Sequence, residues 1–449
     1  MLTMLAVWFA LLFVLVIFAI GTKHHGGALT LAYFAGLSLI HVPGILVFLG
    51  DGVGFENEQE TAIGFVLTLA GMAAFVAGAI VAVRSDKLPS MVLTPRGRDA
   101  GLGRMGWRFI VAGFLAYFVF VPISFSVPSL TSGIAALGTL LVVGLWIELY
   151  VAITTRDRRR TMVALALVPL LPFATVVSGG FISYGTNWAL SAVAFQFVIV
   201  RRRIAFYAAA PVVVFLGLSL FVTYMGERTG IREVVQQQQA SISDRLSRVS
   251  AIATEFSLLD LDSSIHRAHL NDRLNQNFLV GAGYFRHEAG LTDLAYGSTI
   301  PWWAPIPRAI WTEKPEVGGG GDLVAQYTGI SFGSDTSVGV GQVLEFYINF
   351  GIPGIVIGFF GLGFVLMRLD RGIMRAFASN DLRKMLLMAM PALNLLQPGG
   401  NLLEIVVGTV TALLTAYILL YFGVFRLPAK SSGPSNRGDV GDARALTRR

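Results

Sequence analysis

Long apolar runs follow one another along this chain, and short polar segments separate them. Most runs hold roughly 20 residues, enough for an α-helix to cross the ~30 Å hydrocarbon layer of a bilayer. A transmembrane β-barrel would instead alternate apolar and polar positions in shorter segments. The pattern therefore predicts an all-α polytopic membrane protein. We expect about eleven spans, at residues 2–20, 27–50, 61–83, 107–123, 131–153, 161–178, 183–200, 204–224, 340–367, 385–397 and 403–425.

One polar stretch is too long to be a simple connection between spans. It covers residues 225–339 and carries nine basic and thirteen acidic residues. We expect it to form a loop domain on one face of the membrane. The predicted parts are an N-terminal bundle of about eight spans (1–224), the loop domain (225–339), the C-terminal spans (340–426) and a disordered tail (427–449).

Two parts of the loop domain have the composition of segments that lie at a membrane surface. The first repeats apolar residues at seven-residue intervals, which indicates an amphipathic helix. The repeating positions are Val235, Ile242, Val249 and Phe256. The second, "YGSTIPWWAPIPRAIWTEKP", contains four prolines and three tryptophans. Since tryptophan favours headgroup depth, we expect this segment to lie at the interface over the helix bundle.

Composition supports the membrane assignment. Hydrophobic residues make up 54% of the chain and charged residues only 14%, whereas a soluble domain carries about 25% charged residues. The chain has no cysteine, which excludes disulfides, thiolate chemistry and cysteine-based metal sites.

The positions of the 34 Lys and Arg residues predict the orientation in the membrane. Six alternate segments between spans hold 24 of them, and the loop domain holds nine. Basic residues accumulate on the cytoplasmic side. We therefore expect the N terminus and the loop domain outside the cytoplasmic membrane and the C terminus in the cytoplasm. The pI near 9.7 reflects this topology, and no nucleic-acid partner is expected.

The first candidate for chemistry is the pair Arg308 and Lys314 in "IPRAIWTEKP". Arginine offers a planar fork to two phosphate oxygens, and lysine adds a point charge. Beside the bilayer, this pair suits a lipid-linked pyrophosphate. The alternative is that both cations pair with Glu313, Glu316 or lipid headgroups.

Ionisable residues near the ends of spans are the second set of candidates. Glu345, in "GQVLEFYINFG", could accept a proton from a sugar hydroxyl or bind hydroxyls, because carboxylates in a membrane are usually functional. The alternative is a structural salt bridge. Glu404 is placed similarly, after the irregular "QPGGN". We expect His41 to be a core histidine and Glu148 to pair with a cytoplasmic arginine.

The loop domain also carries cations and histidines. No spacing among them matches a metal site, so neither a metal nor a cofactor is predicted. "RHE" at 286–288 could supply a general base through His287. The residues concerned are Arg267, Arg273, Arg286, His266, His269 and His287.

The order of motifs in residues 295–355 resembles bacterial oligosaccharide repeat-unit polymerases, the Wzy-type O-antigen polymerases. A tyrosine-glycine pair, "IPRAIWTEKP", a Gly-rich stretch and "GQVLEFYINFGIPG" follow one another. The rest of the chain is similar only in its plan of spans and large outer loop. The resemblance implies a GT-C-like, metal-independent membrane glycosyltransferase acting on polyprenyl-pyrophosphate-linked oligosaccharides, with a chain-length regulator as a further partner.

The resemblance also implies roles for individual residues. Arg308 and Lys314 would stabilise the departing pyrophosphate, and Glu345 would orient or deprotonate the attacking hydroxyl. Arg273 and Arg286 would bind phosphates of the second carrier. The remaining predicted substrate-binding residues are His287, Tyr296, Tyr347 and Asn349.

Topology supports a lipid-carried donor, because activated nucleotide sugars are cytoplasmic and the large polar domain is expected outside. Three other functions remain open. A glycan ligase would require an essential histidine in the loop domain. A transporter or flippase of lipid-linked glycans would show internal repeats, broken helices and charge near the midplane. A structural assembly subunit would need none of these features.

Overall fold

The structure is a computed structural model of the chain, and it describes residues 1–21, 26–51, 57–85, 99–121, 128–200, 204–236, 242–301, 303–306, 310–314, 319–331 and 338–424. Within these ranges it contains helices and no strand. The helices are α1 (Leu2–Gly21), α2 (Ala28–Asp51), α3 (Glu58–Arg84), α4 (Asp99–Leu115), the π-helix η1 (Ala116–Phe120), α6 (Pro128–Thr154), α7 (Arg158–Leu167), α8 (Leu170–Gly179), α9 (Ile182–Ile199), α10 (Ile204–Gln236), α11 (Ile242–Thr254), α12 (Ser264–Arg273), α13 (Gln276–Glu288), α14 (Gly320–Thr328), α15 (Gln342–Ala378), α16 (Leu382–Leu395) and α17 (Leu402–Tyr421).

Nine helical segments of the described ranges are long and apolar enough to cross a membrane, and they coincide with nine of the eleven predicted spans. The prediction of an all-α polytopic membrane protein is confirmed. The other two predicted spans, 183–200 and 385–397, correspond to α9 and α16, which are not among the nine. The 14 residues of α16 extend roughly 21 Å, short of the ~30 Å that a span needs. The count of eleven stays a prediction.

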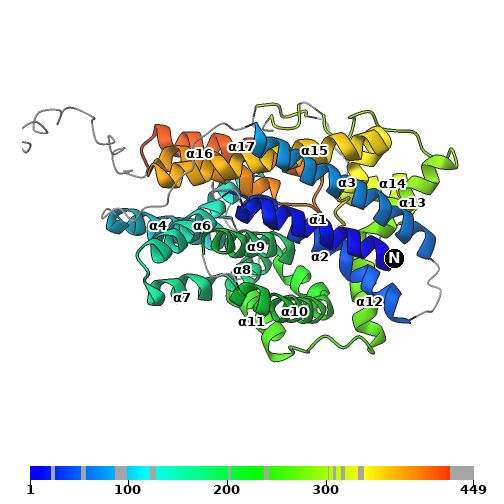
Figure 1. Cartoon of the computed structure of the whole chain (residues 1–449), viewed down its shortest axis with the longest axis horizontal. Helices are drawn as coiled ribbons and strands as arrows, with labels where there is room; N and C mark the ends of the chain where they lie inside the picture. The colour runs from blue at the N-terminus through cyan, green and yellow to red at the C-terminus, as the bar shows by residue number, and fades with distance from the viewer. Residues whose placement is uncertain are drawn as a thin grey trace, which may run out of the picture.

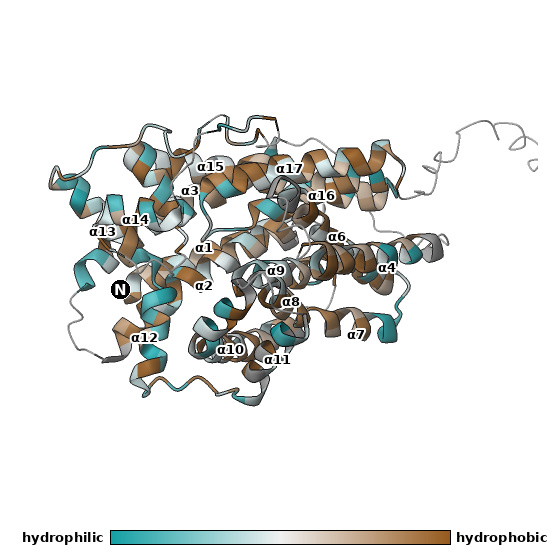
Figure 2. Cartoon of the chain, turned by 180° about the vertical axis from the view of Figure 1, so that it is seen from behind, coloured by the Kyte–Doolittle hydropathy of each residue, from teal (hydrophilic) through white to brown (hydrophobic). Residues whose placement is uncertain are grey.

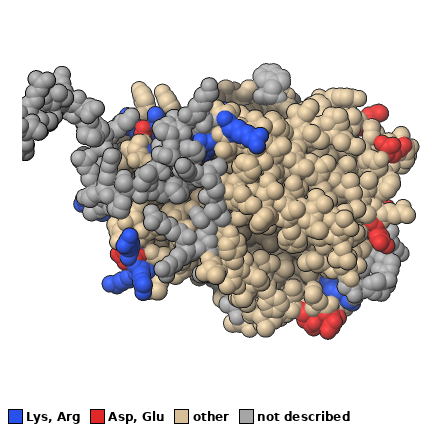
Figure 3. All heavy atoms as spheres, viewed as in Figure 1, with Lys and Arg blue, Asp and Glu red and all other residues tan. Residues whose placement is uncertain are grey.

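The helices run back and forth between two ends of the molecule (Figure 1). The N terminus, α12, α13 and α14 lie at one end, which we call the α13 end, and α7 begins at the opposite end, the α7 end. Polar residues gather at both ends, with apolar helices between them (Figure 2). In Figure 3, most visible acidic residues lie at the α13 end, and a large basic group lies toward the α7 end. The predicted orientation in the membrane stays a prediction.

Helices α3 and α15 pack along each other and form the centre of the bundle. Gly71 of α3 faces Ile355 and Phe359, and Gly363 of α15 lies directly against the backbone of Phe75. A methyl group at Gly363 would collide with the Phe75 carbonyl. Small residues at these positions allow the close approach that holds membrane helices together.

Helix α15 is broken near its start. Phe350 (φ −143°, ψ 17°) and Gly351 (φ 63°, ψ −153°) leave the helical region. Beyond the break, a Cβ placed on Gly358 would lie 2.6 Å from the ring of Phe346. Twelve residues of continuous helix would separate these two positions by roughly 18 Å. Residues 342–349, called the half-helix from here on, therefore fold back along the helix that follows.

The predicted span at 340–367 was therefore wrong in its bounds. The continuous helix begins after Gly351 and reaches Ala378. Glycine at 351 adopts a positive φ without strain, and Pro353, which has no N–H to donate, suits the first turn of a new helix. The sequence "FGIPG" thus reverses the chain where the apolar pattern alone predicts a straight helix.

The predicted boundary between bundle and loop domain falls inside a helix. Helix α10 continues past residue 224 to Gln236, and α11 follows it. The predicted amphipathic helix covers the end of α10 and the whole of α11, and residues 237–241 between them lie outside the described ranges. Val249 is buried as expected, whereas Phe256 lies beyond the end of α11 and is 43% exposed. Helices α11, α12 and α13 pack against α8, α2 and α3, so the described part of the loop domain lies directly on the spans.

A hydrogen-bond network fixes the turn between α12 and α13 to the bundle. The Nδ1 atom of His41 lies 2.7 Å from the side-chain oxygen of Asn277, whose amide donates to the His41 carbonyl at 2.8 Å. Thr68 donates to the same Asn277 oxygen at 3.2 Å. His41 is 1% exposed, as expected for a core histidine, although its Nε2 has no hydrogen-bond partner within the described part.

An ion pair lies at the α7 end. Glu148 of α6 accepts from the Nε of Arg160 at 2.7 Å. Gly103 and Gly106 of α4 pack over the two side chains. The predicted pairing of Glu148 with an arginine is confirmed.

Candidate functional site

The half-helix carries three of the predicted site residues, Glu345, Tyr347 and Asn349. Residues 295–297 run alongside its last turn. The N–H groups of Ala295 and Tyr296 donate to the carbonyls of Ile348 and Asn349 at 2.8 and 3.0 Å. The break after the half-helix removes the N–H groups of a following turn, which would otherwise donate to these carbonyls. The predicted "YG" motif therefore caps the half-helix.

Asn349 holds this arrangement with its side chain. Its oxygen accepts from the Gly297 N–H at 2.9 Å, and its amide donates to the hydroxyl of Thr299 at 2.8 Å. Tyr296 takes a positive φ of 46°, and its side chain is 75% exposed. Tyr296 is thus available to a ligand, whereas Asn349 is buried and positions the loop.

Glu345 lies wholly inside the protein. Its Oε2 accepts from the N–H of Leu402, the first residue of α17, at 2.6 Å. Its Oε1 is buried, and the Thr299 hydroxyl is a hydrogen-bond partner of the carboxylate. The carboxylate of Glu404 lies within electrostatic range. The buried carboxylate caps a helix N-terminus, where its negative charge is favoured.

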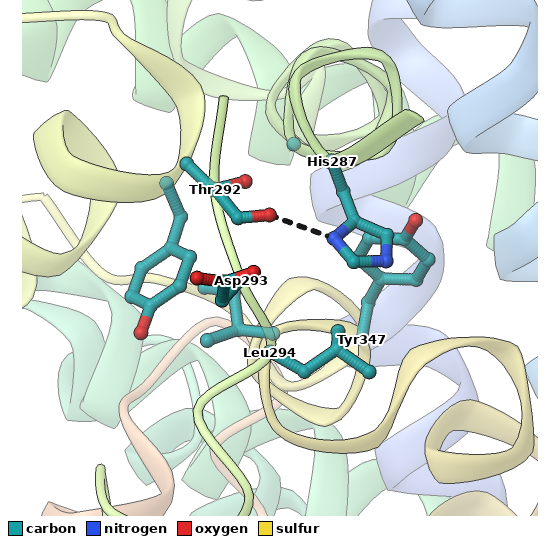
Figure 4. A pocket seen from close by; sticks show the side chains of 8 residues that line it. His287, Thr292, Asp293, Leu294 and Tyr347 are labelled. Atoms are coloured by element: carbon teal, nitrogen blue, oxygen red, sulfur yellow. Dashed lines mark hydrogen bonds between the residues drawn. The ribbon is translucent and has the colours of Figure 1, made fainter. Parts of the chain in front are cut away.

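A small hollow lies between the end of α13 and the half-helix (Figure 4). His287 points into it, and its Nδ1 lies 2.9 Å from the carbonyl oxygen of Thr292. The ring of His287 meets that of Tyr347 edge to face at 6.1 Å. Tyr327 also lines the hollow, and burial together with Asp293 raises the pKa of its phenol. The cavity volume of the hollow is about 10 Å³, room for about one water molecule and far below the ~300 Å³ of typical ligand pockets.

Arg286 lies beside this hollow and packs over Gly329, the residue that ends α14. Its Nε is buried and has no hydrogen-bond partner in the described part of the chain. The structure thus brings Arg286 and His287 close to the half-helix. Arg273 is the last residue of α12, before α13 begins at Gln276. From there, α13 extends roughly 15 Å to Arg286.

The Arg308 and Lys314 pair is described only in part. Arg308 lies outside the described residues, so its predicted role stays a prediction. The ammonium of Lys314 donates to the carbonyls of Ala304 and Ile306 at 2.6 and 3.0 Å. It also lies 5.6 Å from the centre of the Trp303 ring. Lys314 therefore closes its own proline-rich loop.

A cluster of three arginines, which the sequence did not reveal as a unit, surrounds Arg273. Arg228 and Arg232 of α10 lie within electrostatic range of Arg273 of α12. Burial lowers the pKa of the Arg273 guanidinium, and the neighbouring charges of Arg228 and Arg232 lower it further, while Asp272 opposes them. We call Arg228, Arg232 and Arg273 the arginine cluster. The four-residue spacing of the first two on one helix was the available sequence signal.

The turn between α8 and α9 connects the arginine cluster to the rest of the bundle. Tyr224, to which Arg228 is hydrogen-bonded, donates to the carbonyl of Gly180 at 2.8 Å. Arg232 lies 5.7 Å from the centre of the Phe181 ring. Two members of the cluster are therefore held at this turn.

A further arginine on α11 belongs to the same region of the fold. Arg245 is 3% exposed, and two of its guanidinium nitrogens have no hydrogen-bond partner within the described ranges. Burial lowers its pKa. Val249, one turn further along α11, packs in an apolar cluster with Val176 and Tyr224. Sequence reasoning assigned Arg245 no role.

No group of three or more metal-binding side chains occurs among the described residues. No protein-family model, curated protein or solved structure matches the chain.

Proposed function

We propose that the protein is a membrane glycosyltransferase that polymerises polyprenyl-pyrophosphate-linked oligosaccharide repeat units on the outer face of the bacterial cytoplasmic membrane. The observation that carries the proposal is the arginine cluster at the end of a membrane-length helix. In this proposal the α13 end faces outward, with the N terminus outside and the C terminus in the cytoplasm.

The first half of helix α10 is apolar and its second half carries the arginine cluster. A phosphorylated lipid likewise has an apolar chain and a charged head group. The second half of α10 contacts α8, α11 and α12. Side chains of its first half are exposed to a large extent, including Val212 at 57% and Val213 at 60%. An isoprenoid chain would cover this apolar surface while its diphosphate reaches the guanidinium groups. Arginine suits phosphate because its planar fork can donate two parallel hydrogen bonds.

The chemistry follows from the same charges. Transfer of a glycan from a lipid pyrophosphate leaves negative charge on the departing group. Preorganised cations stabilise such charge as it develops. An anion among the three guanidinium groups would be attracted by each of them, so the cluster would favour the product pyrophosphate as well as the donor.

The hollow near His287 is too small to enclose a sugar ring, so a glycan would lie over its rim. There Tyr327, Tyr347 and His287 supply ring surfaces, and Asp293 supplies an acceptor for hydroxyls. The rest of the glycan would lie along exposed residues such as Tyr296.

Gene deletion and complementation test this proposal. Loss of the protein should leave surface glycan of one repeat unit on a ladder gel. Complementation with Arg228→Ala/Arg232→Ala/Arg273→Ala should fail to restore long chains. The matched control, Arg158→Ala/Arg159→Ala, removes exposed charges at the α7 end and should restore them. Accumulation of precursor on the cytoplasmic side would contradict polymerisation and indicate a transporter.

A glycan ligase is the second candidate, because His269 lies beside Arg273 on α12. A ligase would use a histidine here to activate an acceptor. In that case the deletion strain would retain full-length glycan on its lipid carrier, and His269→Ala alone would abolish transfer.

A further inference from the structure

Arg245 is a buried cation without a compensating partner among the described residues. Its side chain is 3% exposed, and its Nε and Nη1 atoms form no hydrogen bond there. Burial lowers its pKa, and within the described part no carboxylate opposes this effect. Arg245 also lies in the first turn of α11, where the helix dipole disfavours a positive charge. An unpaired buried charge costs folding free energy, so an anion bound to Arg245 would relieve this cost.

The packing of α10 and α11 sets the position of Arg245. Five residues of sequence connect these helices, which pack against each other and therefore form an antiparallel hairpin. Val249, one turn beyond Arg245 on the same face of α11, packs in an apolar cluster with Tyr224 and Ile231 of α10. Arg232 lies four residues before the end of α10, and Arg245 lies three residues after the start of α11. These two arginines are therefore at the same level of the hairpin.

The cations form two levels along α10. Arg228 and Arg273 make up the first level, because Arg228 lowers the pKa of Arg273 more than Arg232 does. Arg232 lies one turn further along α10, and Arg245 belongs to this second level. The apolar first half of α10 precedes both levels. A polyprenyl diphosphate has the same order of groups, with an isoprenoid chain, a first phosphate and a second phosphate.

We propose that Arg245 makes the site specific for a diphosphate, because it binds the second phosphate group, to which the sugar is attached. Arg228 and Arg273 then hold the phosphate next to the isoprenoid chain. A guanidinium can donate two parallel hydrogen bonds to one phosphate. A polyprenyl monophosphate would occupy the first level alone and leave Arg245 unpaired. The inference rests on the proposed function, which supplies the class of lipid.

The stability of the ligand-free protein separates this role from a structural one. Arg245→Met keeps an apolar stem of similar length and removes the unpaired charge. The unfolding midpoint of this variant in detergent should therefore equal or exceed that of the wild type. A lower midpoint would mean that Arg245 stabilises the fold, and it would contradict a residue that waits for an anion.

The binding test uses the full-length protein in phosphatidylcholine nanodiscs, with undecaprenyl diphosphate and undecaprenyl phosphate as probes. The wild type should bind the diphosphate about ten- to a hundredfold more tightly, as expected for one additional charged contact. Arg245→Met should lose most of this preference and keep its affinity for undecaprenyl phosphate. Arg245→Lys should retain part of the preference, because lysine keeps the charge without the planar fork. The control Arg158→Gln removes an exposed charge at the α7 end and should match the wild type.

An unchanged preference in both Arg245 variants would overturn the proposal, as would an equal loss of affinity for both lipids in Arg245→Met. Inorganic pyrophosphate distinguishes a lipid-borne from a free diphosphate. Weak competition by it supports the lipid, whereas binding as tight as that of undecaprenyl diphosphate would overturn a lipid site.

Failure of the proposed function would have a different signature. If the ladder gel contradicts polymerisation while Arg245→Met loses the preference for diphosphate, the proposed reaction is wrong and the assignment of Arg245 stands. If the gel supports polymerisation while Arg245→Met keeps the preference, the assignment of Arg245 alone is wrong.

Discussion

The Oε2 atom of Glu345 accepts a hydrogen bond from the backbone N–H of Leu402 at 2.6 Å, across 57 residues of sequence. The contact joins the half-helix to the N-terminus of α17. This hydrogen bond fixes the start of α17 against the half-helix.

Removal of this carboxylate should lower stability in a graded way. Glu345→Ala leaves the Leu402 N–H buried without an acceptor, which costs about 1–3 kcal/mol. Glu345→Gln keeps an acceptor and loses only the charge, so its unfolding midpoint in detergent should lie between those of the alanine variant and the wild type. A glutamine variant less stable than the alanine variant would contradict the capping role.

Asp370 performs a similar task at the α7 end. Its two oxygens accept from the N–H groups of Leu29 and Thr30 at 2.8 and 3.1 Å, at the start of α2. Asp370→Ala should cost about 2–4 kcal/mol, because charged hydrogen bonds to buried donors are lost. Asp157→Ala is the comparison, since Asp157 caps α7 at an exposed position and should cost about 1 kcal/mol. Thermal unfolding of both variants measures the difference.

The fold-back of the half-helix can be tested with two alanine variants in the same helix. A Cβ at Gly354 would collide with the Phe346 carbonyl, so Gly354→Ala should destabilise the protein by about 1–3 kcal/mol through overpacking. Gly361 has open space around it. Gly361→Ala should therefore be neutral or stabilising by up to about 1 kcal/mol. Equal effects of the two variants on stability would mean that the half-helix does not lie along the rest of α15.

Much of the bundle could be predicted from sequence because the apolar runs are local. The Glu148–Arg160 pair could be predicted as well, since both residues flank one short turn. The fold-back could not, because apolar residues continue through Phe350 and Gly351 and conceal the reversal. The glycine and proline of "FGIPG" were the available signal. The arginine cluster joins residues on helices separated by a long stretch of chain, and no periodicity reports such a contact.

For the site as well, local features could be predicted from the sequence, and contacts between distant segments could not. Asn349 and Tyr296, predicted to bind substrate, belong to neighbouring motifs, and the structure places them at the end of the half-helix that carries Glu345. Their predicted role in binding stays a prediction. Burial of Glu345 depends on how α17 packs, which the sequence of the motif does not contain. The role of Arg308 stays a prediction.

Acidic pH should weaken the fold through His269. Burial and the neighbouring charges of His266 and Arg273 lower its pKa below the ordinary 6.5, although Asp272 opposes them. As the pH falls, His269 therefore binds a proton in the unfolded chain at a higher pH than in the folded protein. The free energy of unfolding should decline below about pH 6.5 for this reason. Above that pH, His269 should not affect stability. His269→Gln should show a smaller decline. An identical pH dependence in unfolding midpoints of both proteins would exclude this contribution.

The reversal at Gly351 also has a consequence for how the chain matches a bilayer. A straight rod of the 37 residues of α15 would measure roughly 55 Å, far beyond the ~30 Å of hydrocarbon that it must traverse. Without the reversal, the surplus would force a steep tilt or a local thickening of the lipid, both of which cost free energy. Because the half-helix folds back along the rest of α15, its length does not add to the length of the rod. The remaining helix therefore matches the hydrocarbon thickness more closely.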